Sequence, residues 1–356
     1  METGAPLLSA LTTLRLGGAA RRMVSAGDDA AILAAVREAD AAGEPLLVLA
    51  GGSNVVVADD GFPGTVLLIA SRGVKRDARD DGRVVLDVAA GEPWDPFVAG
   101  CVADGRSGVE CLSGIPGSVG ATPIQNVGAY GQEVAETVES VRVLDRHSGE
   151  VEELAAAECG FSYRSSSFKR EPGRWVVLRV RFVLDAARDS APIRYAELAR
   201  ALGVEIGERA PCSDVREAVL ALRRAKGMVI DPDDLDSVSA GSFFTNPILE
   251  AEAFAALERR VAERLDPDAR PPAWPEDGGR IKTSAAWLIE RAGFARGHGN
   301  AEGIAISSKH TLALTNRGAG TTSELVALAR EIAGGVREAF GVELHPEPVL
   351  VGPDWP

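Results

Sequence analysis

The sequence is poor in the residues that build disulfide scaffolds and histidine metal sites. It has four cysteines in 356 residues, at positions 101, 111, 159 and 212, and no CxxC pair. That density is far below that of a disulfide scaffold, so we expect reduced thiols in a cytoplasmic protein. The four histidines, at positions 147, 298, 310 and 345, are never spaced four residues apart, and no metal site is predicted.

Long apolar runs and an excess of positive charge are also lacking. No apolar run reaches the length of about 18 residues that predicts a membrane span, and residues 1–13 lack the basic start and apolar core of a secretory signal. Lysine and arginine number 38 against 52 aspartates and glutamates, a net charge of −14. Such a surface repels nucleic-acid phosphates and anionic lipid head groups. We therefore expect a cytoplasmic protein that neither binds nucleic acid nor inserts into membranes.

What is present is a globular composition and a mixed pattern of helices and strands. Hydrophobic residues make up 46% and charged residues 25%, which excludes wholesale disorder, and the length allows two or three domains. Helical periodicity and capping signals predict helices over residues 28–43, 95–105, 195–203, 213–229, 251–265, 282–294 and 323–341. Apolar runs and alternation predict strands over residues 46–49, 54–57, 64–70, 83–92, 174–184, 311–316 and 342–351, and a hairpin over 137–154. The fold class is α+β, and the polar stretch 231–241 is expected to precede a last domain.

Two glycine-rich segments are candidates for binding a nucleotide cofactor. The first, Gly51, Gly52, Ser53 and Asn54, lies between two predicted strands, where a tight turn is the alternative interpretation. The second lies within residues 108–131, a long loop of the kind that is usually functional. Because glycine lets a phosphate approach backbone amides, the two loops together could hold a pyrophosphate and a heterocycle without net positive charge.

A third segment resembles the glycine-rich sequence motif of dinucleotide-binding proteins. Residues 311–326 suggest a strand, a Gly-x-Gly-x-x-Ser turn and a helix. Ser323 replaces the third glycine, and only one strand–helix–strand unit is present, so we favour a helix-capping loop in which Thr322 or Ser323 satisfies the first amides.

Seven motifs in a fixed order give the chain a specific resemblance. They are TTLRLGG (12–18), AGGSN (50–54), GIPGSVGATPIQNVGAYGQE (114–133), FSYRSSSFK (161–169), AGSFFTNP (240–247), KTSAAWLIERAGF (282–294) and ELHPEPVLVG (343–352). In these motifs the chain resembles the MurB family of UDP-N-acetylenolpyruvoylglucosamine reductases, flavoenzymes of peptidoglycan precursor synthesis. The resemblance covers almost the whole sequence.

The resemblance implies a fold and a set of ligands. It implies a two-lobed FAD-binding domain of the vanillyl-alcohol-oxidase type (residues 1–75 and 76–230, the second lobe with a substrate-covering insert) and a C-terminal substrate domain (231–356). It also implies FAD, NADPH as co-substrate and a UDP-sugar substrate. Because neither flavin-binding motif contains a cysteine or histidine, we expect the FAD to be noncovalent, and we expect a monomer. Carried onto this sequence, the cofactor contacts are Gly51, Gly52, Ser53, Asn54, Gly114, Ile115, Pro116, Gly117, Ser118, Gly120, Gln125, Asn126, Gly128, Ala129 and Tyr130.

Three residues are implied to carry the chemistry. Reduction of an enolpyruvyl ether places negative charge on the carbon beside the new C–H bond and on its carboxylate, so the site needs a cation and an acid. By resemblance, hydride comes from reduced flavin, Ser242 gives the proton, and Arg164 and Glu347 stabilise the enolate. Taken alone, each has a plainer interpretation: a surface salt bridge for Arg164, a cap or turn serine for Ser242, and a solvated carboxylate on an edge strand for Glu347.

The substrate contacts implied in the same way are Tyr195, Arg223, Lys226 and Asn246. Thr245 stands where many members of the family carry lysine. Two other functions stay open at this stage: an oxidase or dehydrogenase on the same FAD fold with another sugar or alcohol, and a noncatalytic nucleotide-binding protein with structural glycine loops.

Overall fold

The computed structural model describes residues 6–79 and 81–355, which divide into two compact units. Unit 1 contains Ala19–Gly52 and Phe62–Val229. The boundary predicted between residues 75 and 76 falls inside strand β5 (Val74–Ala78), and the division of this unit into two lobes stays a prediction.

Unit 2 is assembled from three separate stretches of the chain. It combines Leu7–Gly18 and Ser53–Gly61 with the chain from Ile230 onward. Strand β3 (Val55–Val57) of the second stretch pairs in parallel with β18 (Val349–Val351) near the C-terminus. The expected C-terminal domain therefore includes two short segments from the N-terminal part of the sequence.

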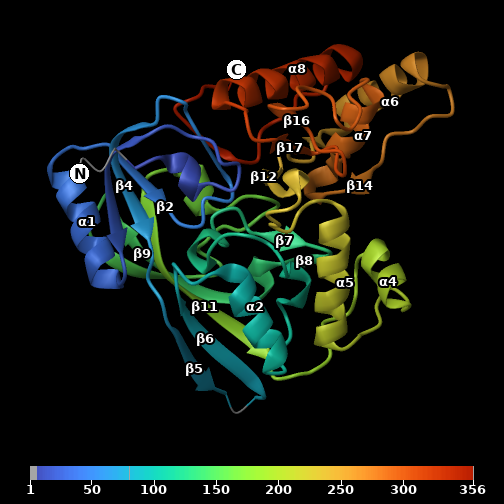
Figure 1. Ribbon diagram of the computed structural model, residues 1–356. Coiled ribbons are helices and arrows are strands. Elements are labelled where there is room, and N and C mark those ends of the chain that lie inside the picture. Colours follow the sequence, from blue (N-terminus) through green and yellow to red (C-terminus); the bar gives the residue numbers. More distant parts are fainter. Residues whose placement is uncertain (1–5, 80, 356) are drawn as a thin grey trace. The chain divides into compact units, whose positions relative to one another are not determined.

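Unit 1 is built on two sheets (Figure 1). The first is parallel, in the order β1-β4-β2, and the second is antiparallel, in the order β10-β9-β11-β6-β5. The strands are β1 (Ala20–Ala26), β2 (Leu46–Leu49), β4 (Phe62–Ile69), β6 (Arg83–Ala89), β9 (Val138–Asp145), β10 (Val151–Ala155) and β11 (Trp175–Asp185), with the short pair β7 (Gly128–Ala129) and β8 (Gln132–Glu133). Buried residues of both sheets belong to one hydrophobic core.

The helices of unit 1 are α1 (Asp29–Ala41), α2 (Trp94–Ala103), α3 (Ser167–Arg170), α4 (Ala196–Leu202) and α5 (Cys212–Ala225). Helices α1, α2, α4 and α5 correspond to predicted helices, and the short α3 was not predicted. Asp28 caps α1 by accepting a hydrogen bond from the Ala31 amide, and Ile32 and Val36 are buried in the core. Helix α5 differs from the prediction at both ends: it begins at Cys212, directly after Pro211, and it ends at Ala225.

Unit 2 carries three helices and two three-stranded sheets. The helices are α6 (Ala251–Arg264), α7 (Ala285–Arg291) and α8 (Thr322–Phe340). The sheets have the orders β12-β17-β16 and β13-β15-β14, formed by β12 (Ser239–Ser242), β13 (Ile248–Leu249), β14 (Trp274–Pro275), β15 (Ile281–Lys282), β16 (Ile304–Ile306) and β17 (Ala313–Asn316). Their buried side chains form a second core. The mixed helix and strand content confirms the α+β prediction.

Two details of unit 2 correct the sequence analysis. The cap of α8 is Thr321, in a capping box with Glu324, and the Thr322 and Ser323 amides donate instead to Asp59 at 2.7 and 2.9 Å. The strand predicted over 342–351 is limited to β18, because the prolines that flank Glu347 lack the amide that a ladder needs. No helix in the described part of the chain is long and apolar enough to cross a membrane.

The four cysteines are free and buried. Burial raises the pKa of Cys101, Cys159 and Cys212 to about 12 and raises the pKa of Cys111 as well. Because only the thiolate reacts readily, the native protein at pH 8 should react with Ellman's reagent far more slowly than a free thiol, with all four thiols reacting in guanidinium. Rapid reaction of any thiol in the native protein would contradict this packing.

Candidate functional site

The two glycine-rich segments meet backbone to backbone in unit 1. A Cβ atom on Gly51 would lie 2.5 Å from the Gly117 Cα and 3.3 Å from the Ser118 amide nitrogen. A Cβ on Gly120 would lie 2.4 Å from that of Ala90. No real side chain tolerates such contacts, so these glycines allow the close approach of the chains. The first motif is divided, since Gly51 and Gly52 belong to unit 1 and Ser53 and Asn54 to unit 2.

Two buried polar atoms in and beside this loop are unsatisfied within the described part of the chain. The Ser118 hydroxyl oxygen and the Arg223 Nε are buried and have no hydrogen-bond partner among the described residues. A Cβ on Gly114 would lie 3.4 Å from the same Arg223 nitrogen. The close approach of the two glycine-rich segments, together with buried polar atoms left unsatisfied, suits a bound phosphate-containing cofactor such as FAD.

The loop that follows is held in shape by Asn126. Its side chain donates to Glu133 at 2.7 Å and to the Ser162 carbonyl at 3.2 Å, and it accepts from the Ala135 amide at 3.1 Å. Asn126 and Tyr130 both have positive φ angles, of 47° and 49°. Only a loop fixed by its surroundings keeps such backbone angles in residues other than glycine, so Asn126 shapes the predicted cofactor loop.

Arg164 lies in a tight turn and reaches the same loop. Its φ angle is +52°, and the turn is closed by reciprocal backbone hydrogen bonds between Ser162 and Ser165. The guanidinium donates to the Gly128 carbonyl at 2.8 Å and lies 5.4 Å from the centre of the Tyr163 ring. The structure therefore places the predicted catalytic arginine against a predicted cofactor-binding segment of its own unit.

The predicted substrate contacts of unit 1 form a cluster with Tyr130. Tyr195 precedes α4 and packs its ring edge-on against Tyr130, with centroids 5.5 Å apart. Lys226 lies over the Tyr130 ring at 5.6 Å and forms a 2.6 Å ion pair with Glu197. Burial raises the pKa of Tyr130 to about 12, so its hydroxyl stays protonated at neutral pH.

Arg223, one turn before Lys226 on α5, is almost completely buried. One guanidinium nitrogen donates to the Met228 carbonyl at 2.7 Å. Burial lowers the pKa of Arg223 to about 10, an effect opposed by the nearby Tyr130 and Asp95. The side chain stays cationic at neutral pH, and a bound anion would restore the stabilisation that burial removes. Sequence reasoning missed Glu197, whose only signal was its place in the first turn of the helix after Tyr195.

Ser242 and Glu347 are brought together in unit 2. Ser242 ends β12, and the residues after it run antiparallel to the His345–Glu347 segment. The Glu347 amide donates to the Phe243 carbonyl at 2.8 Å, and the Thr245 amide donates to the His345 carbonyl at 3.1 Å. Two residues 105 positions apart in the sequence are thus carried by neighbouring segments. Because Ser242 ends a strand, the helix-cap alternative is excluded.

Asn54 holds the same segment from its other side. Its side-chain Nδ2 donates to the Glu347 carbonyl at 3.3 Å, and its backbone carbonyl accepts from the Val349 amide at 3.0 Å. The Glu347 backbone is therefore fixed both by the segment after Ser242 and by the end of the first glycine motif. Asn246 accepts from the Ala285 amide at 3.0 Å, which places it at the start of α7.

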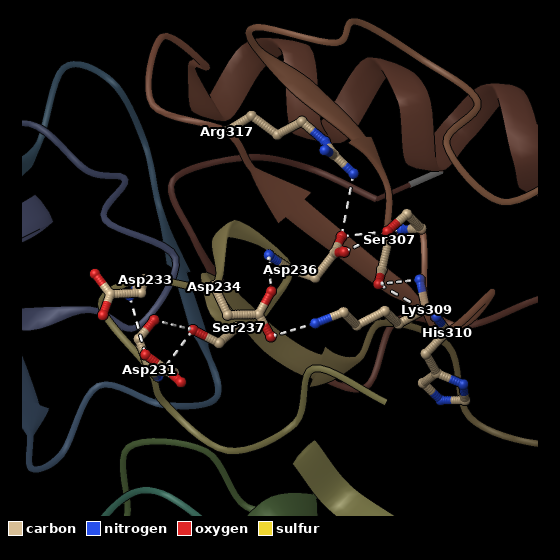
Figure 2. A network of polar contacts seen from close by, with 10 residues as sticks. Asp231, Asp233, Asp234, Asp236, Ser237, Ser307, Lys309, His310 and Arg317 are labelled. Carbon is tan, nitrogen blue, oxygen red and sulfur yellow. Dashed lines mark hydrogen bonds and ion pairs between the residues drawn. The ribbon is translucent and has the colours of Figure 1, made fainter. Parts of the chain in front are cut away.

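A network of polar contacts anchors the chain just before β12 (Figure 2). Asp236, buried in a short 3-10 helix, accepts from the Ser308 amide at 2.9 Å, from its hydroxyl, and from Arg317 at 3.1 Å. Lys309 forms a 2.8 Å ion pair with Asp234. Burial would raise the pKa of Asp236, but the hydrogen bonds from Ser308 outweigh it and hold that pKa below its ordinary value.

Asp236→Asn should therefore destabilise the protein by about 2 kcal/mol at pH 7, since Arg317 and Ser308 lose a charged acceptor. The stability that the carboxylate contributes is present above its unfolded pKa of about 3.9 and is lost as the pH falls through its lower folded pKa. Urea unfolding at pH 7 and at pH 3 measures the difference. Asp233→Asn, an exposed neighbour in the same turn, is the control. Equal midpoints for the two variants at pH 7 would contradict the role of Asp236.

Comparison with known proteins agrees with this arrangement. The family profile of the UDP-N-acetylenolpyruvoylglucosamine reductase C-terminal domain matches residues 232–351, and that of an FAD binding domain matches residues 20–155. A UDP-N-acetylenolpyruvoylglucosamine reductase of Streptomyces coelicolor is 60% identical over 97% of this chain and 89% of its own length. The Thermobifida fusca relative of the same name is 57% identical, over 97% of this chain and 96% of its own length.

A solved structure extends the similarity to the fold. The crystal structure of UDP-N-acetylenolpyruvylglucosamine reductase from Thermus caldophilus superposes with a TM-score of 0.63 over 97% of both chains, at 24% sequence identity. At that sequence identity the match supports a shared fold and nothing more.

Proposed function

The chain belongs to the UDP-N-acetylenolpyruvoylglucosamine reductase family, and from this premise we propose that it reduces UDP-N-acetylglucosamine enolpyruvate to UDP-N-acetylmuramate with NADPH, through bound FAD. The observation that carries the proposal is the pairing of Ser242 and Glu347 on hydrogen-bonded segments, with Asn54 against them. The reaction would supply a precursor of peptidoglycan in the cytoplasm.

FAD is proposed to bind noncovalently along the glycine-rich segments. The close approach of Gly51 to Gly117 and the unsatisfied Ser118 hydroxyl support this assignment. When bound and reduced by NADPH, the flavin would supply the hydride that the enolpyruvyl group accepts. The motifs at residues 50–54 and 114–133 contain no cysteine or histidine, and burial raises the pKa of the nearby Cys111 thiol, which argues against a covalent flavin link.

Arg164 is proposed to stabilise the negative charge that reduction places on the substrate carboxylate and adjacent carbon. Its planar guanidinium offers several donors in a fixed geometry, and the strained turn limits where those donors point. Because the group is always cationic, it stabilises the developing charge without first having to gain a proton.

Ser242 is proposed to donate the proton that completes the reduction. A hydroxyl is a weak acid, so this role requires neighbours that stabilise the alkoxide left behind. Glu347 is proposed to orient and polarise the reacting enolpyruvyl group, and its backbone is held in place by the hydrogen bonds to Phe243 and Asn54.

The remaining predicted contacts are proposed to bind the sugar nucleotide. Lys226 and Arg223 would meet the diphosphate, Tyr195 would pack on the ligand, and Asn246 would contact the sugar. For Lys226 this requires exchange of its ion-pair partner, because Glu197 holds its ammonium group at 2.6 Å. Thr245 keeps the backbone contact with His345 but supplies no charge of its own.

Cofactor content and product mass test the proposed function. The purified protein should be yellow, release intact FAD on acid precipitation, and convert the enolpyruvyl substrate with NADPH to a product heavier by two hydrogen atoms. A protein that does not bind FAD would support the noncatalytic alternative. An FAD protein that leaves this substrate unchanged, but oxidises another sugar or alcohol, would support the other enzyme class.

A further inference from the structure

A carboxylate outside the proposed site joins the glycine-rich loop to helix α5. Asp95 lies in the first turn of α2 and is partly buried. Its Oδ1 accepts from the Gly114 amide at 2.6 Å, and its two oxygens accept from the two Nη atoms of Arg216 at 2.6 and 2.9 Å. Burial would raise the pKa of Asp95, but the Arg216 and Gly114 hydrogen bonds hold it below the ordinary value. Such a bidentate contact fixes the guanidinium in position as well as neutralising it.

The start of the glycine-rich loop also lies directly against α5. Gly114 has a φ angle of +72°, and a Cβ there would lie 2.7 Å from Leu220 Cδ2 and 3.2 Å from Val229 Cγ2. No side chain can be added at this position without displacing Leu220. The loop and α5 therefore contact each other both through Asp95 and through van der Waals packing.

Helix α5 carries groups that the proposed function assigns to the diphosphate. Arg216 and Arg223 are seven residues apart, a spacing that places them on one face of a helix, and Lys226 follows the last turn. A shift of α5 relative to the loop would therefore move the proposed diphosphate contacts relative to the proposed cofactor contacts.

We propose that Asp95 is a positioning residue that links the cofactor loop to α5, the helix that carries the proposed diphosphate contacts, so that binding of FAD and binding of the sugar nucleotide strengthen each other. The inference rests on the proposed function and adds to it an energetic coupling between two ligands. Neither Asp95 nor Arg216 needs to touch a ligand for this role.

The rest of the loop has independent anchors. The Trp94 amide donates to the Gly117 carbonyl at 3.0 Å, and the Val119 amide donates to the Glu92 carbonyl at 2.8 Å. Replacing Asp95 by asparagine keeps an oxygen for the Gly114 amide but removes the charge that holds Arg216. Asp95→Asn is therefore expected to fold and to lose mainly the link between loop and helix.

Flavin fluorescence after dilution of the holoprotein gives the FAD dissociation constant with and without saturating UDP. In the wild type, UDP should tighten FAD binding by about tenfold, within the usual range of coupling between two sites. In Asp95→Asn and in Arg216→Gln this factor should fall below about twofold. The double variant should lose no more coupling than either single variant, because both remove the same interaction.

A matched control is the ion pair of Asp145 and Arg174, which also joins two oxygens of one carboxylate to one guanidinium. Asp145→Asn should keep the wild-type coupling, and far-UV circular dichroism should show that all variants are folded. UDP that leaves FAD binding unchanged in the wild type, or coupling that persists in Asp95→Asn, would overturn the inference while leaving the proposed function intact. A wild-type protein without FAD would instead overturn the proposed function itself.

Discussion

Ser242→Ala should leave the reduction of bound flavin by NADPH near the wild-type rate and block its reoxidation by the enolpyruvyl substrate. The substitution removes only a hydroxyl at the end of β12, where the backbone pairs with Ala313. The hydrogen bonds of Phe243 to Leu312 and to Glu347 involve the main chain alone and are retained. Loss of a general acid typically slows the step that needs it by about 100-fold to 10,000-fold.

Stopped-flow absorbance resolves the two half-reactions of this variant. The matched control is Ser25→Ala, which removes a hydroxyl from an exposed position of strand β1. Turnover equal to wild type in Ser242→Ala would exclude Ser242 as the proton donor. Equal loss of both half-reactions would show instead that the substitution disturbs flavin binding.

Arg164→Lys should lose a factor of about 100 or more in turnover although it keeps a positive charge. The loss is of the size expected when a donor to a developing oxyanion is removed. A lysine ammonium cannot reproduce the planar guanidinium, which holds several N–H groups in one plane and donates one of them to the Gly128 carbonyl. Because the effect is on charge developed during reaction, kcat should fall more than the affinity for the substrate.

Steady-state kinetics compare this variant with Arg170→Lys as control. Arg170 is an exposed arginine of the same segment. Its guanidinium donates hydrogen bonds to the Gly160 carbonyl and to the Ser165 hydroxyl. A rate near wild type in Arg164→Lys would show that Arg164 has a structural role in its strained turn and no catalytic role. A loss of the same size in Arg170→Lys would show that the segment as a whole is sensitive.

Local patterns predicted much of the fold. The Asp28 cap and the apolar spacing of α1 are properties of adjacent residues, and so is the turn at His147–Gly149 between β9 and β10. Strand β1, the short helix α3 and the short strands β5, β7, β8 and β12 to β16 were not predicted. The cap of α8, Thr321, is a local feature that was assigned one or two residues too late, whereas Asp59, which accepts from two of the first amides of α8, is 263 residues from Thr322. Such contacts depend on tertiary packing, which no local window contains.

In the candidate site, too, the sequence predicted single residues from local motifs but not the contacts between distant residues. The motifs predicted Arg164, Ser242 and Glu347 as separate residues, and Ser242 and Glu347 are carried by hydrogen-bonded segments. The partners of the site residues had no local signal. Glu197 becomes the partner of Lys226, and Asp95 that of Gly114, only when α2, α4 and α5 are packed. The division of the first glycine motif between two units was equally invisible in the sequence.

An anaerobic double-mixing experiment tests the central claim most directly. The FAD-loaded protein is mixed with NADPH and then with UDP-N-acetylglucosamine enolpyruvate, while flavin absorbance is followed. The account predicts bleaching by NADPH and full recovery on addition of the substrate in the absence of oxygen. Bleaching that persists after the substrate is added would contradict the proposed reaction, because the reduced protein would then need a different oxidant.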